Sequence, residues 1–283
     1  MSLCICCNVS GQEWEVKEAL FNRVGNEFVP TGLAGSPWHS SLLHGGAPAG
    51  LLAFCLGQEA GSSGLQPARL SIDLLRPVPN APLRVEVRPL REGKRILLLE
   101  ASLSAGGTLV ALASALFIKS TPLNLPDYAP KPKGGLPSPD QLDEVSFRDV
   151  LFAKSEDMPL GLHTTVRLRP ASLLNETGTG RAWIRLPADI IAGEQNSPFM
   201  LAALVSDFGN GVGQLSLGDG VGTINADIVL QLSRLPVGEW IGLECITLME
   251  TTGVGQVISS LYDEQGRIGQ VNQTVMPMPG FGG

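Results

Sequence analysis

An aspartate near the end of an otherwise apolar segment is the first candidate for chemistry in this sequence. Residues 196–211, NSPFMLAALVSDFGNG, are apolar on nearly every face of a helix except at Asp207. Such a helix is expected to be buried, and a buried carboxylate is costly unless it is hydrogen-bonded or reactive. Asp207 could therefore serve as a general base, or it could lie exposed where the helix frays.

Two buried helices are predicted, and one of them carries Asp207. In the helix predicted over 197–209, Ser197 is a suitable N-cap and Pro198 suits the first turn, where its missing N–H costs nothing. The stretch 46–56 is also apolar on all sides and predicts a second buried helix.

The segments around these helices predict long antiparallel strands, because apolar and polar residues alternate and glycine-bearing turns separate them. In the first half these are a hairpin within 14–38 and strands at 68–75, 83–90, 95–104 and 108–120. In the second half they are strands at 161–173, 180–190, 223–234, 239–251, 255–266 and 267–276.

The order of elements repeats about every 160 residues. Arg76 and Arg234 end equivalent strands 158 residues apart, and Gly107 and Gly266 lie in equivalent turns 159 apart. The stretch 121–143 is rich in proline and without periodicity. We therefore predict an N-terminal repeat (1–120), a Pro-rich linker (121–145) and a C-terminal repeat (146–283).

Composition excludes several classes of function. The chain has 283 residues, of which 43% are hydrophobic, so it can bury a large core. A net charge of −7 without a run of Lys or Arg argues against a nucleic-acid or anionic-membrane partner. No apolar stretch is long enough for a membrane span, and the N-terminus has no basic region of a signal peptide, so a cytoplasmic location is expected.

The cysteines and histidines do not predict a metal site. Cys4, Cys6 and Cys7 form a cluster without a second ligand pair, which suggests a frayed terminus with reduced thiols. The three histidines show no metal-binding spacing. We expect neither a metal nor an organic cofactor.

The chain resembles the TesB-like (type II) acyl-CoA thioesterase family, in its double-hotdog, thioesterase-like branch. The resemblance lies in the repeated pattern and in the order and spacing of a set of residues. The resemblance implies an α+β fold of two tandem hotdog repeats, each a long antiparallel sheet wrapped round one buried helix. The residues that carry it are His44–Gly46, Asp207, Thr223–Asn225, Arg234, Glu239–Trp240, Tyr262–Asp263, Gly266–Gly269 and Gln273.

The resemblance also implies a catalytic set. In the family an Asp, a Thr, Ser or Asn, and a Gln hold the attacking water, and the matching positions here are Asp207, Asn225 and Gln273. An Asn in place of Thr is a departure, since it donates and accepts but has no hydroxyl. Asn272 competes for the Gln role if the register slips by one residue.

Strand alternation supports one of these positions and opposes another. Gln273 alternates with Val271 and Val275, so it should face the helices. Asn225 should point outward, because Ile224 belongs to the apolar face of its strand. Only a bulge or the seam between the repeats would bring Asn225 inward.

The thioester carbonyl needs backbone N–H donors, and two helix starts compete for this role. One is His44–Gly46, where Gly45 and Gly46 allow close approach; the other is Pro198–Met200. The candidate substrate-binding residues are therefore His44, Gly45, Gly46, Phe199 and Met200. His44 is either a catalytic base or a local feature of the helix start.

The first repeat lacks the polar residues of the second. The offset of 158 places Ala49 opposite Asp207, and Ser114 or Ala115 opposite Gln273. One working site per chain is therefore expected. The candidate cations for CoA phosphates are Arg76, Arg88, Arg91, Lys94 and Arg95.

The function expected from this resemblance is hydrolysis of an acyl-CoA to free CoA and a carboxylate. Two alternatives remain open at this stage. One is a non-catalytic module that binds acyl-CoA or fatty acid, and the other is a hotdog enoyl-CoA hydratase, disfavoured because no His follows residue 163. The resemblance also implies a homodimer or a higher homo-oligomer of double hotdogs.

Overall fold

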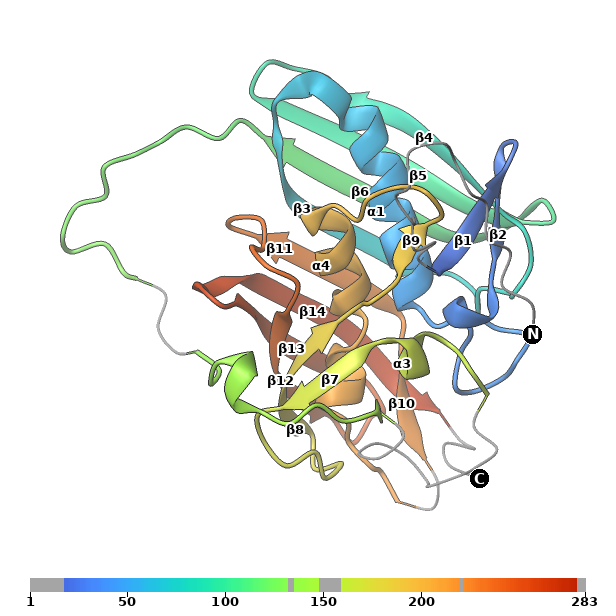
Figure 1. The fold of residues 1–283 in the computed structure, drawn as a ribbon, viewed down its shortest axis with the longest axis vertical. Coiled ribbons are helices and arrows are strands. Elements are labelled where there is room, and N and C mark those ends of the chain that lie inside the picture. Colours follow the sequence, from blue (N-terminus) through green and yellow to red (C-terminus); the bar gives the residue numbers. More distant parts are fainter. Residues whose placement is uncertain (1–17, 132–134, 148–158, 219–220, 279–283) are drawn as a thin grey trace, which may run out of the picture.

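One continuous sheet of 14 strands curves around two helices in the computed structural model of the protein (Figure 1). The structure describes residues 18–131, 135–147, 159–218 and 221–278. All strand pairs are antiparallel except one, and the two helices lie side by side on the inner face of the sheet. The core sits between these helices and the sheet. This is the α+β double-hotdog arrangement that the resemblance predicts.

The N-terminal half contains a hairpin, a long helix and four long strands, with short 3₁₀ turns between elements. Its elements are β1 (Ala19–Val24), β2 (Glu27–Pro30), η1 (Gly32–Ala34), α1 (Gly46–Ala60), η2 (Gly61–Ser63), β3 (Gln66–Leu74), β4 (Leu83–Arg91), β5 (Ile96–Ala105) and β6 (Thr108–Ile118). Of the four long strands, β4, β5 and β6 form a meander and β3 pairs with β6.

The C-terminal half has the same plan with more interruptions. Its elements are η3 (Pro139–Gln141), α3 (Leu162–Thr165), β7 (Arg167–Pro170), β8 (Thr179–Arg185), β9 (Asp189–Ile191), α4 (Pro198–Ser206), α5 (Gly209–Val212), β10 (Gly222–Asn225), β11 (Asp227–Leu232), β12 (Ile241–Met249), β13 (Gly255–Asp263) and β14 (Gly266–Met278).

The two halves join where β3 pairs with β11, and this pairing has two-fold symmetry. Ser71 lies opposite Val229, and these residues are 158 positions apart. On either side, Leu70 pairs with Leu230 and Ile72 with Ile228. A rotation about the central pair therefore exchanges the two strands, so the register supports the duplication read from the sequence.

The irregularities of the sheet are duplicated as well. The β5–β6 ladder shifts register between Leu103 and Ser104, and the β13–β14 ladder shifts between Leu261 and Tyr262, again 158 positions apart. The strand β3 shifts against β6 around Ala68, and β10 gives way to β11 at Ala226. Bulges at matching positions show that both repeats share one backbone plan.

Small residues let α1 and α4 approach each other closely. A Cβ atom on Gly46 would lie 2.7 Å from the backbone oxygen of Leu204, and one on Gly50 would lie 3.5 Å from Leu204 Cβ. Because the helices are antiparallel at this contact, the first turn of α1 meets the last turn of α4. The packing therefore decides which helix end faces Asp207.

Three sequence predictions need correction. The stretch 161–173 begins with α3 and not with a strand, because the hydroxyls of Thr164 and Thr165 donate to the carbonyl of Gly161 and close a helical turn. The helix predicted over 197–209 ends at Ser206 and resumes as α5. The strand predicted over 223–234 is broken into β10 and β11.

Two other expectations from the sequence have no structural test. The cysteine cluster near the N-terminus lies outside the described residues. The repeat and linker boundaries at 120 and 145 stay predictions, although part of the predicted linker packs on the second half, where Trp183 Nε1 donates to the carbonyl of Pro137 at 2.8 Å.

Candidate active site

Asp207 lies at the C-terminal end of α4, against the start of α1, and only 8% of its surface is exposed. Both carboxylate oxygens have partners from other elements. Oδ1 accepts a hydrogen bond from Asn225 Nδ2 at 2.9 Å, and Oδ2 lies 2.9 Å from His44 Nδ1. The N-terminus of α1 adds a favourable dipole for this negative charge. The carboxylate is thus buried and held by groups from both repeats.

His44 connects the carboxylate to the cavity beside it. Its Nδ1 lies 2.9 Å from Asp207 Oδ2 and 3.2 Å from the Gly46 amide nitrogen. A single ring nitrogen cannot donate to the first and accept from the second, so we assign the proton to Nδ1 because the carboxylate contact is shorter and charged. Phe208 stacks on the imidazole with ring centroids 4.6 Å apart and fixes its plane.

Gly45 is required by the position of the carboxylate. A Cβ atom at this residue would lie 2.7 Å and 2.8 Å from the two carboxylate oxygens of Asp207. The Gly45 amide has no hydrogen-bond acceptor among the described residues, and Gly45 lines the cavity. Its N–H is therefore a free donor at a helix N-terminus, next to a buried carboxylate.

Asn225 faces the core because of the bulge at Ala226. Directly paired residues share a face of the sheet, and Asn225 pairs with Val275, which is buried. Simple alternation along the strand predicts the outward face, and the extra residue at Ala226 reverses that expectation. Asn225 Oδ1 is buried and has no partner within the described part of the chain.

Gln273 contacts the backbone of Asp207 but does not line the cavity. The residue is 1% exposed, and its Nε2 donates to the backbone oxygen of Asp207 at 3.4 Å. The competing Asn272 faces the other side of β14, where its Oδ1 accepts a hydrogen bond from Gln270. The register read from the sequence therefore brings Gln273, and not its neighbour, to Asp207.

A cavity of about 370 Å³ opens beside Asp207, His44 and Asn225. Its walls are mainly apolar and come from both repeats. Among the described residues that line it, the charged side chains other than histidine are Asp207 and Arg76. The apolar lining residues include Trp38, Leu42, Leu43, Leu74, Leu75, Pro77, Val78, Phe147, Phe208, Ile224, Met276 and Met278.

Phe199 and Met200, expected to bind substrate, are not brought to this cavity. Both are buried at the N-terminal end of α4, where Phe199 meets Phe117 edge to face with centroids 6.0 Å apart. At 1.5 Å per residue, this end lies roughly 12 Å along the helix axis from Asp207. Of the two competing helix starts, only His44–Gly46 meets the carboxylate.

The lining residues that the sequence did not single out include Phe208, Asn210 and His163. Phe208 and Asn210 lie one and three positions after Asp207, so proximity in sequence was their only signal; the Asn210 carboxamide accepts from Thr223 Oγ1 at 2.6 Å. His163 lies on α3, and its ring stacks with the ring of His44, with centroids 6.5 Å apart. No spacing in the sequence links His163 to His44, because the contact forms only when the repeats pack.

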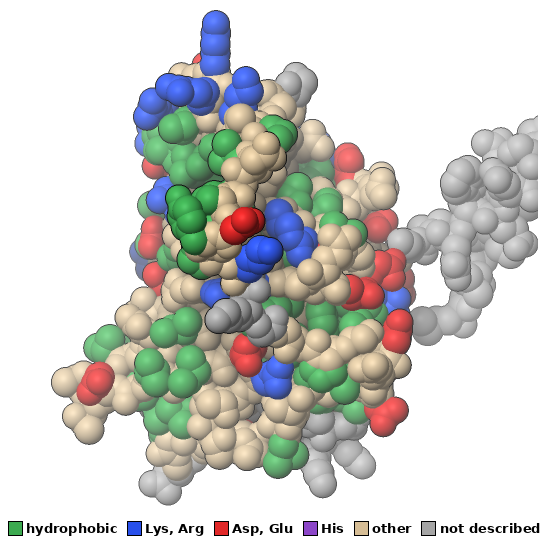
Figure 2. Space-filling view, turned by 90° about the vertical axis from the view of Figure 1, so that its left-hand side faces the viewer, with side chains coloured by type: hydrophobic (Ala, Val, Ile, Leu, Met, Phe, Trp, Pro, Cys, Tyr) green, Lys and Arg blue, Asp and Glu red, His purple; other side chains and the backbone are tan. Residues whose placement is uncertain are grey.

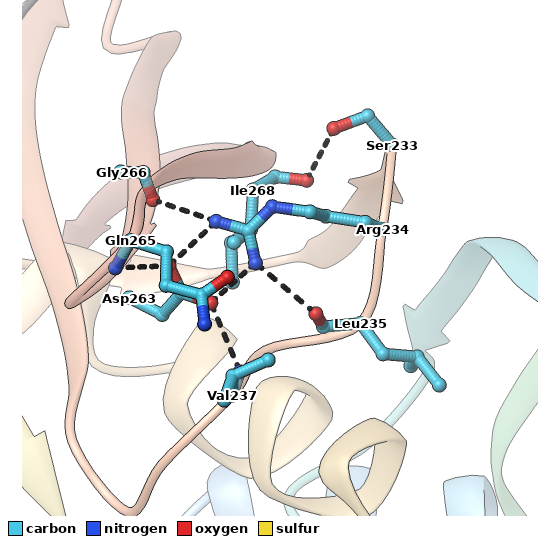
Figure 3. Close-up of polar contacts among 8 residues, drawn as sticks. All are labelled: Ser233, Arg234, Leu235, Val237, Asp263, Gln265, Gly266 and Ile268. Carbon is cyan, nitrogen blue, oxygen red and sulfur yellow. Dashed lines mark hydrogen bonds and ion pairs between the residues drawn. The ribbon is translucent and has the colours of Figure 1, made fainter.

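Arg234, one of the residues that carry the family resemblance, has a structural role (Figure 3). Its guanidinium forms a two-point ion pair with Asp263, whose oxygens also accept from the amides of Val237 and Gln265, each at 2.9 Å. Burial raises the pKa of Asp263, but these hydrogen bonds outweigh it and hold the pKa below its usual value. The pair closes the turn between β13 and β14.

Two further absences concern the described residues only. They contain no group of three or more His, Cys, Asp or Glu side chains arranged to hold a metal ion. None of their helices combines the length and the apolar character needed to cross a membrane.

Family models match both repeats. The model of the acyl-CoA thioesterase N-terminal domain matches residues 34–118, and that of the C-terminal domain matches residues 139–276. The chain belongs to the acyl-CoA thioesterase family. It is therefore a hydrolase of acyl-CoA thioesters, of the TesB-like kind that the sequence resembles. No curated protein matches this thioesterase.

Solved structures share the fold of this thioesterase at low identity. A tesB protein of Mycobacterium avium subs. paratuberculosis has a TM-score of 0.61 and 16% identity, covering 92% of this chain and 96% of that one. The acyl-CoA thioesterase II TesB2 of Mycobacterium marinum has a TM-score of 0.58 and 15% identity, covering 83% and 89%. A hot dog protein of unknown function from Alicyclobacillus acidocaldarius has a TM-score of 0.63 and 14% identity, covering 91% and 95%.

Proposed function

We propose that this thioesterase hydrolyses its substrate with Asp207 as the general base for an attacking water. The observation that carries the proposal is the position of the carboxylate, which is buried at an apolar cavity and held by His44 and Asn225. A buried base next to a free backbone donor is the arrangement that acyl transfer to water requires.

The water would sit between Asp207 and Asn225. It would donate one hydrogen to the Asp207 carboxylate and the other to Asn225 Oδ1, which has no partner among the described residues. Its oxygen lone pair would then point at the thioester carbon. Gln273 acts through the backbone of Asp207, so it is a positioning residue in this proposal.

The Gly45 N–H would stabilise the oxyanion that forms when water attacks the carbonyl. Asp207 takes the proton from the water, the C–S bond breaks, and the proton is returned to the thiolate of CoA. The products are a free acid and CoA. The apolar walls of the cavity suit the acyl chain, whose transfer from water favours binding.

His44 is the alternative base, and one observation favours it. With its Nδ1 on Asp207, the imidazole resembles a His held in one tautomer by an Asp, and its Nε2 has no partner among the described residues. In that scheme Nε2 would accept the proton from water, and Asp207 would orient the ring. The two schemes differ in whether substitution of Asp207 or substitution of His44 causes the larger loss of activity.

The test is CoA release, followed with a thiol reagent, across short-, medium- and long-chain acyl-CoAs. We expect Asp207→Asn to lower kcat by roughly 10³-fold, and His44→Gln to lower it by only about tenfold, since the Gln amide can still donate to the carboxylate. A larger loss in His44→Gln than in Asp207→Asn would transfer the role of base to His44. Full activity in Asp207→Asn would overturn both schemes.

A wild-type protein that binds acyl-CoA tightly but releases no CoA from any substrate would contradict the proposal and favour a binding module. Folding of each variant is checked by its thermal unfolding midpoint. Asn is chosen at position 207 because it keeps the volume and hydrogen-bonding shape of Asp, so a loss of rate reports the missing base.

A further inference from the structure

Arg76 and Arg234 occupy equivalent positions in the two repeats. The residues before them make the same backbone contact: the Leu75 amide donates to Val110, and the Ser233 amide donates to Ile268, each pair 158 positions from the other. Each arginine thus follows the strand at the seam, next to the turn of the neighbouring hairpin. Differences between their surroundings therefore come from side chains and not from the backbone plan.

The carboxylate that neutralises Arg234 has no counterpart beside Arg76. Asp263 pairs with Gly266 across the turn of β13 and β14. Ala105 pairs with Thr108 across the turn of β5 and β6, and both residues are again 158 positions from their counterparts. Where the second repeat has a carboxylate, the first has a methyl group.

As a result, the guanidinium of Arg76 has no carboxylate partner among the residues that the structure describes. It is exposed, and it forms no ion pair or side-chain hydrogen bond within the described part of the chain. It also lines the cavity that contains Asp207, where it is the only Lys or Arg among the described lining residues. A free guanidinium at the mouth of an apolar cavity is a ready partner for a phosphate or carboxylate.

The other candidate cations are elsewhere. Arg88 is paired with Glu100. Arg91 ends β4, and Lys94 and Arg95 lie in the β4–β5 turn that follows, at the upper end of the molecule, where Figure 2 shows a group of Lys and Arg side chains. Leu74, near the Arg76 end of β3, and Leu103 on β5 both pair with Ala111 on β6, so this end of β3 lies close to Leu103. The β4–β5 turn is about 25 Å from Leu103 along β5, at 3.3 Å per residue, and is therefore far from Arg76.

We propose that Arg76 binds an anionic group of the thioester substrate at the mouth of the cavity and so helps to select CoA-linked substrates. The proposal rests on the proposed function of the Asp207 site. Its chemistry is guanidinium–oxyanion pairing, and the oxyanion comes either from the phosphates of CoA or from a carboxylate on the acyl chain.

The first experiment compares Arg76→Gln with wild type on an acyl-CoA and on the same acyl group carried by N-acetylcysteamine, which has no phosphate. We expect KM for the acyl-CoA to rise roughly tenfold with kcat unchanged, and KM for the truncated thioester to stay the same. Arg95→Gln is the matched control, since it removes an equal charge at the far end of the sheet. Because Arg76 is exposed, raising the salt should weaken acyl-CoA binding in wild type and not in Arg76→Gln.

A second variant gives Arg76 the partner that Arg234 already has. Ala105→Asp should pair with Arg76 and raise KM for acyl-CoA by a similar factor. Ser104→Asp adds the same charge to the next residue, whose side chain lies on the opposite face of the strand, and should have a smaller effect. An equal rise in KM for both variants would mean that charge alone, and not Arg76, is responsible.

The source of the anion is decided with a CoA thioester of a dicarboxylic acid and the neutral acyl-CoA of equal length. If Arg76→Gln affects only the dicarboxylic substrate, Arg76 binds the acyl carboxylate; if it affects both, it binds CoA phosphates. An unchanged KM for both would overturn the proposal.

Calorimetric titration with free CoA, dephospho-CoA and pantetheine separates this proposal from the proposed function. These titrations need no turnover. If wild type binds CoA without hydrolysing any thioester, the catalytic proposal fails, while Arg76 is still tested. A weaker binding of CoA by Arg76→Gln then supports the role of Arg76 in phosphate recognition, and equal binding contradicts it.

Discussion

The two repeats of this thioesterase share a backbone but not a set of polar side chains. The seam, the hairpin turns and even the bulges recur 158 positions apart. The side chains at equivalent strand positions differ wherever the second repeat builds the site or its support. These pairs are Asn225 and Pro67, Gln273 and Ala115, and Asp263 and Ala105.

Equivalent positions on the two helices also carry different side chains, but the helices align with a different offset from the strands. Asp207 lies nine positions after Pro198, where α4 starts, and Cys55 lies nine positions after Gly46, where α1 starts. The offset of 158, which pointed to Ala49, fails here because the connection from α5 to β10 is longer than the connection from α1 to β3. Burial raises the pKa of Cys55 to about 12, so this thiol stays protonated and cannot replace a carboxylate.

The difference shows how a duplicated fold arrives at one site. The second repeat supplies the Asp207 carboxylate, which we propose as the base, and the amides of Asn225 and Gln273, while the first supplies His44 and Gly45. Because the pseudo-two-fold axis brings the start of α1 against the end of α4, each repeat completes the other. We therefore expect substitutions at the site to affect activity strongly, and substitutions at equivalent positions in the other repeat to affect it weakly.

The largest effect should come from Gly45→Ala. The added Cβ would overlap the Asp207 carboxylate and so displace both the base and the Gly45 N–H. We expect kcat/KM to fall roughly 10³-fold, since small displacements of catalytic groups are costly. The measurement is CoA release at several substrate concentrations.

Gly57→Ala is the matched control, because a Cβ there meets no atom within 4 Å. It should leave activity unchanged and stabilise α1 by up to about 1 kcal/mol, as expected for Ala in place of Gly in a helix. If Gly45→Ala keeps full activity, Asp207 and Gly45 do not work together, and the site must be sought elsewhere in the cavity.

A smaller effect is expected from Asn225→Ala. The substitution removes the hydrogen bond to Asp207 Oδ1 and the acceptor proposed for the water, so kcat should fall roughly 10²-fold. Pro67→Ala changes the residue equivalent to Asn225 in the first repeat and should not change kcat. Equal kcat values for wild type and Asn225→Ala would remove Asn225 from the mechanism.

Much of the fold followed from the sequence, because long strands and all-apolar helices leave clear periodic signals. The duplication was visible in the spacing of Arg76 and Arg234, and the β3–β11 register agrees with it. The elements that were wrong are short. The turn at α3 is made by threonine hydroxyls, and the helix α4 ends at Ser206, three residues before Gly209, where the sequence predicted its end.

The site was harder to predict, because its contacts depend on how the repeats pack. Alternation alone placed Asn225 outward, and the sequence allowed an inward position only through a bulge or the seam between the repeats. An alignment of the repeats offers a clue once the structure is known, because Ala68 and Ala226 are equivalent positions and each is the bulge residue of its own repeat. The predicted helix already placed Phe199 and Met200 at the end opposite Asp207, but no pattern in the chain could show that the start of α1 packs against the carboxylate.

The smallest effect is expected on the folding stability of the second repeat and not on catalysis. Asp263→Asn leaves Arg234 without its counter-charge, and we expect the free energy of unfolding to fall by about 2 kcal/mol at pH 7. Arg76→Gln is the control in the first repeat. Because Arg76 has no partner to lose within the described residues, its effect should stay within about 0.5 kcal/mol.

The pH dependence of this difference follows from the lowered pKa of Asp263. A carboxylate whose pKa is lower in the folded state stabilises the fold above its unfolded pKa, and this contribution is lost as the pH falls through the folded pKa. The gap between wild type and Asp263→Asn, measured by urea unfolding, should be constant above about pH 5 and close progressively below it. A gap that persists undiminished at about pH 2 would mean that the carboxylate charge is not what holds Arg234, and the contrast with Arg76 would then rest on shape alone.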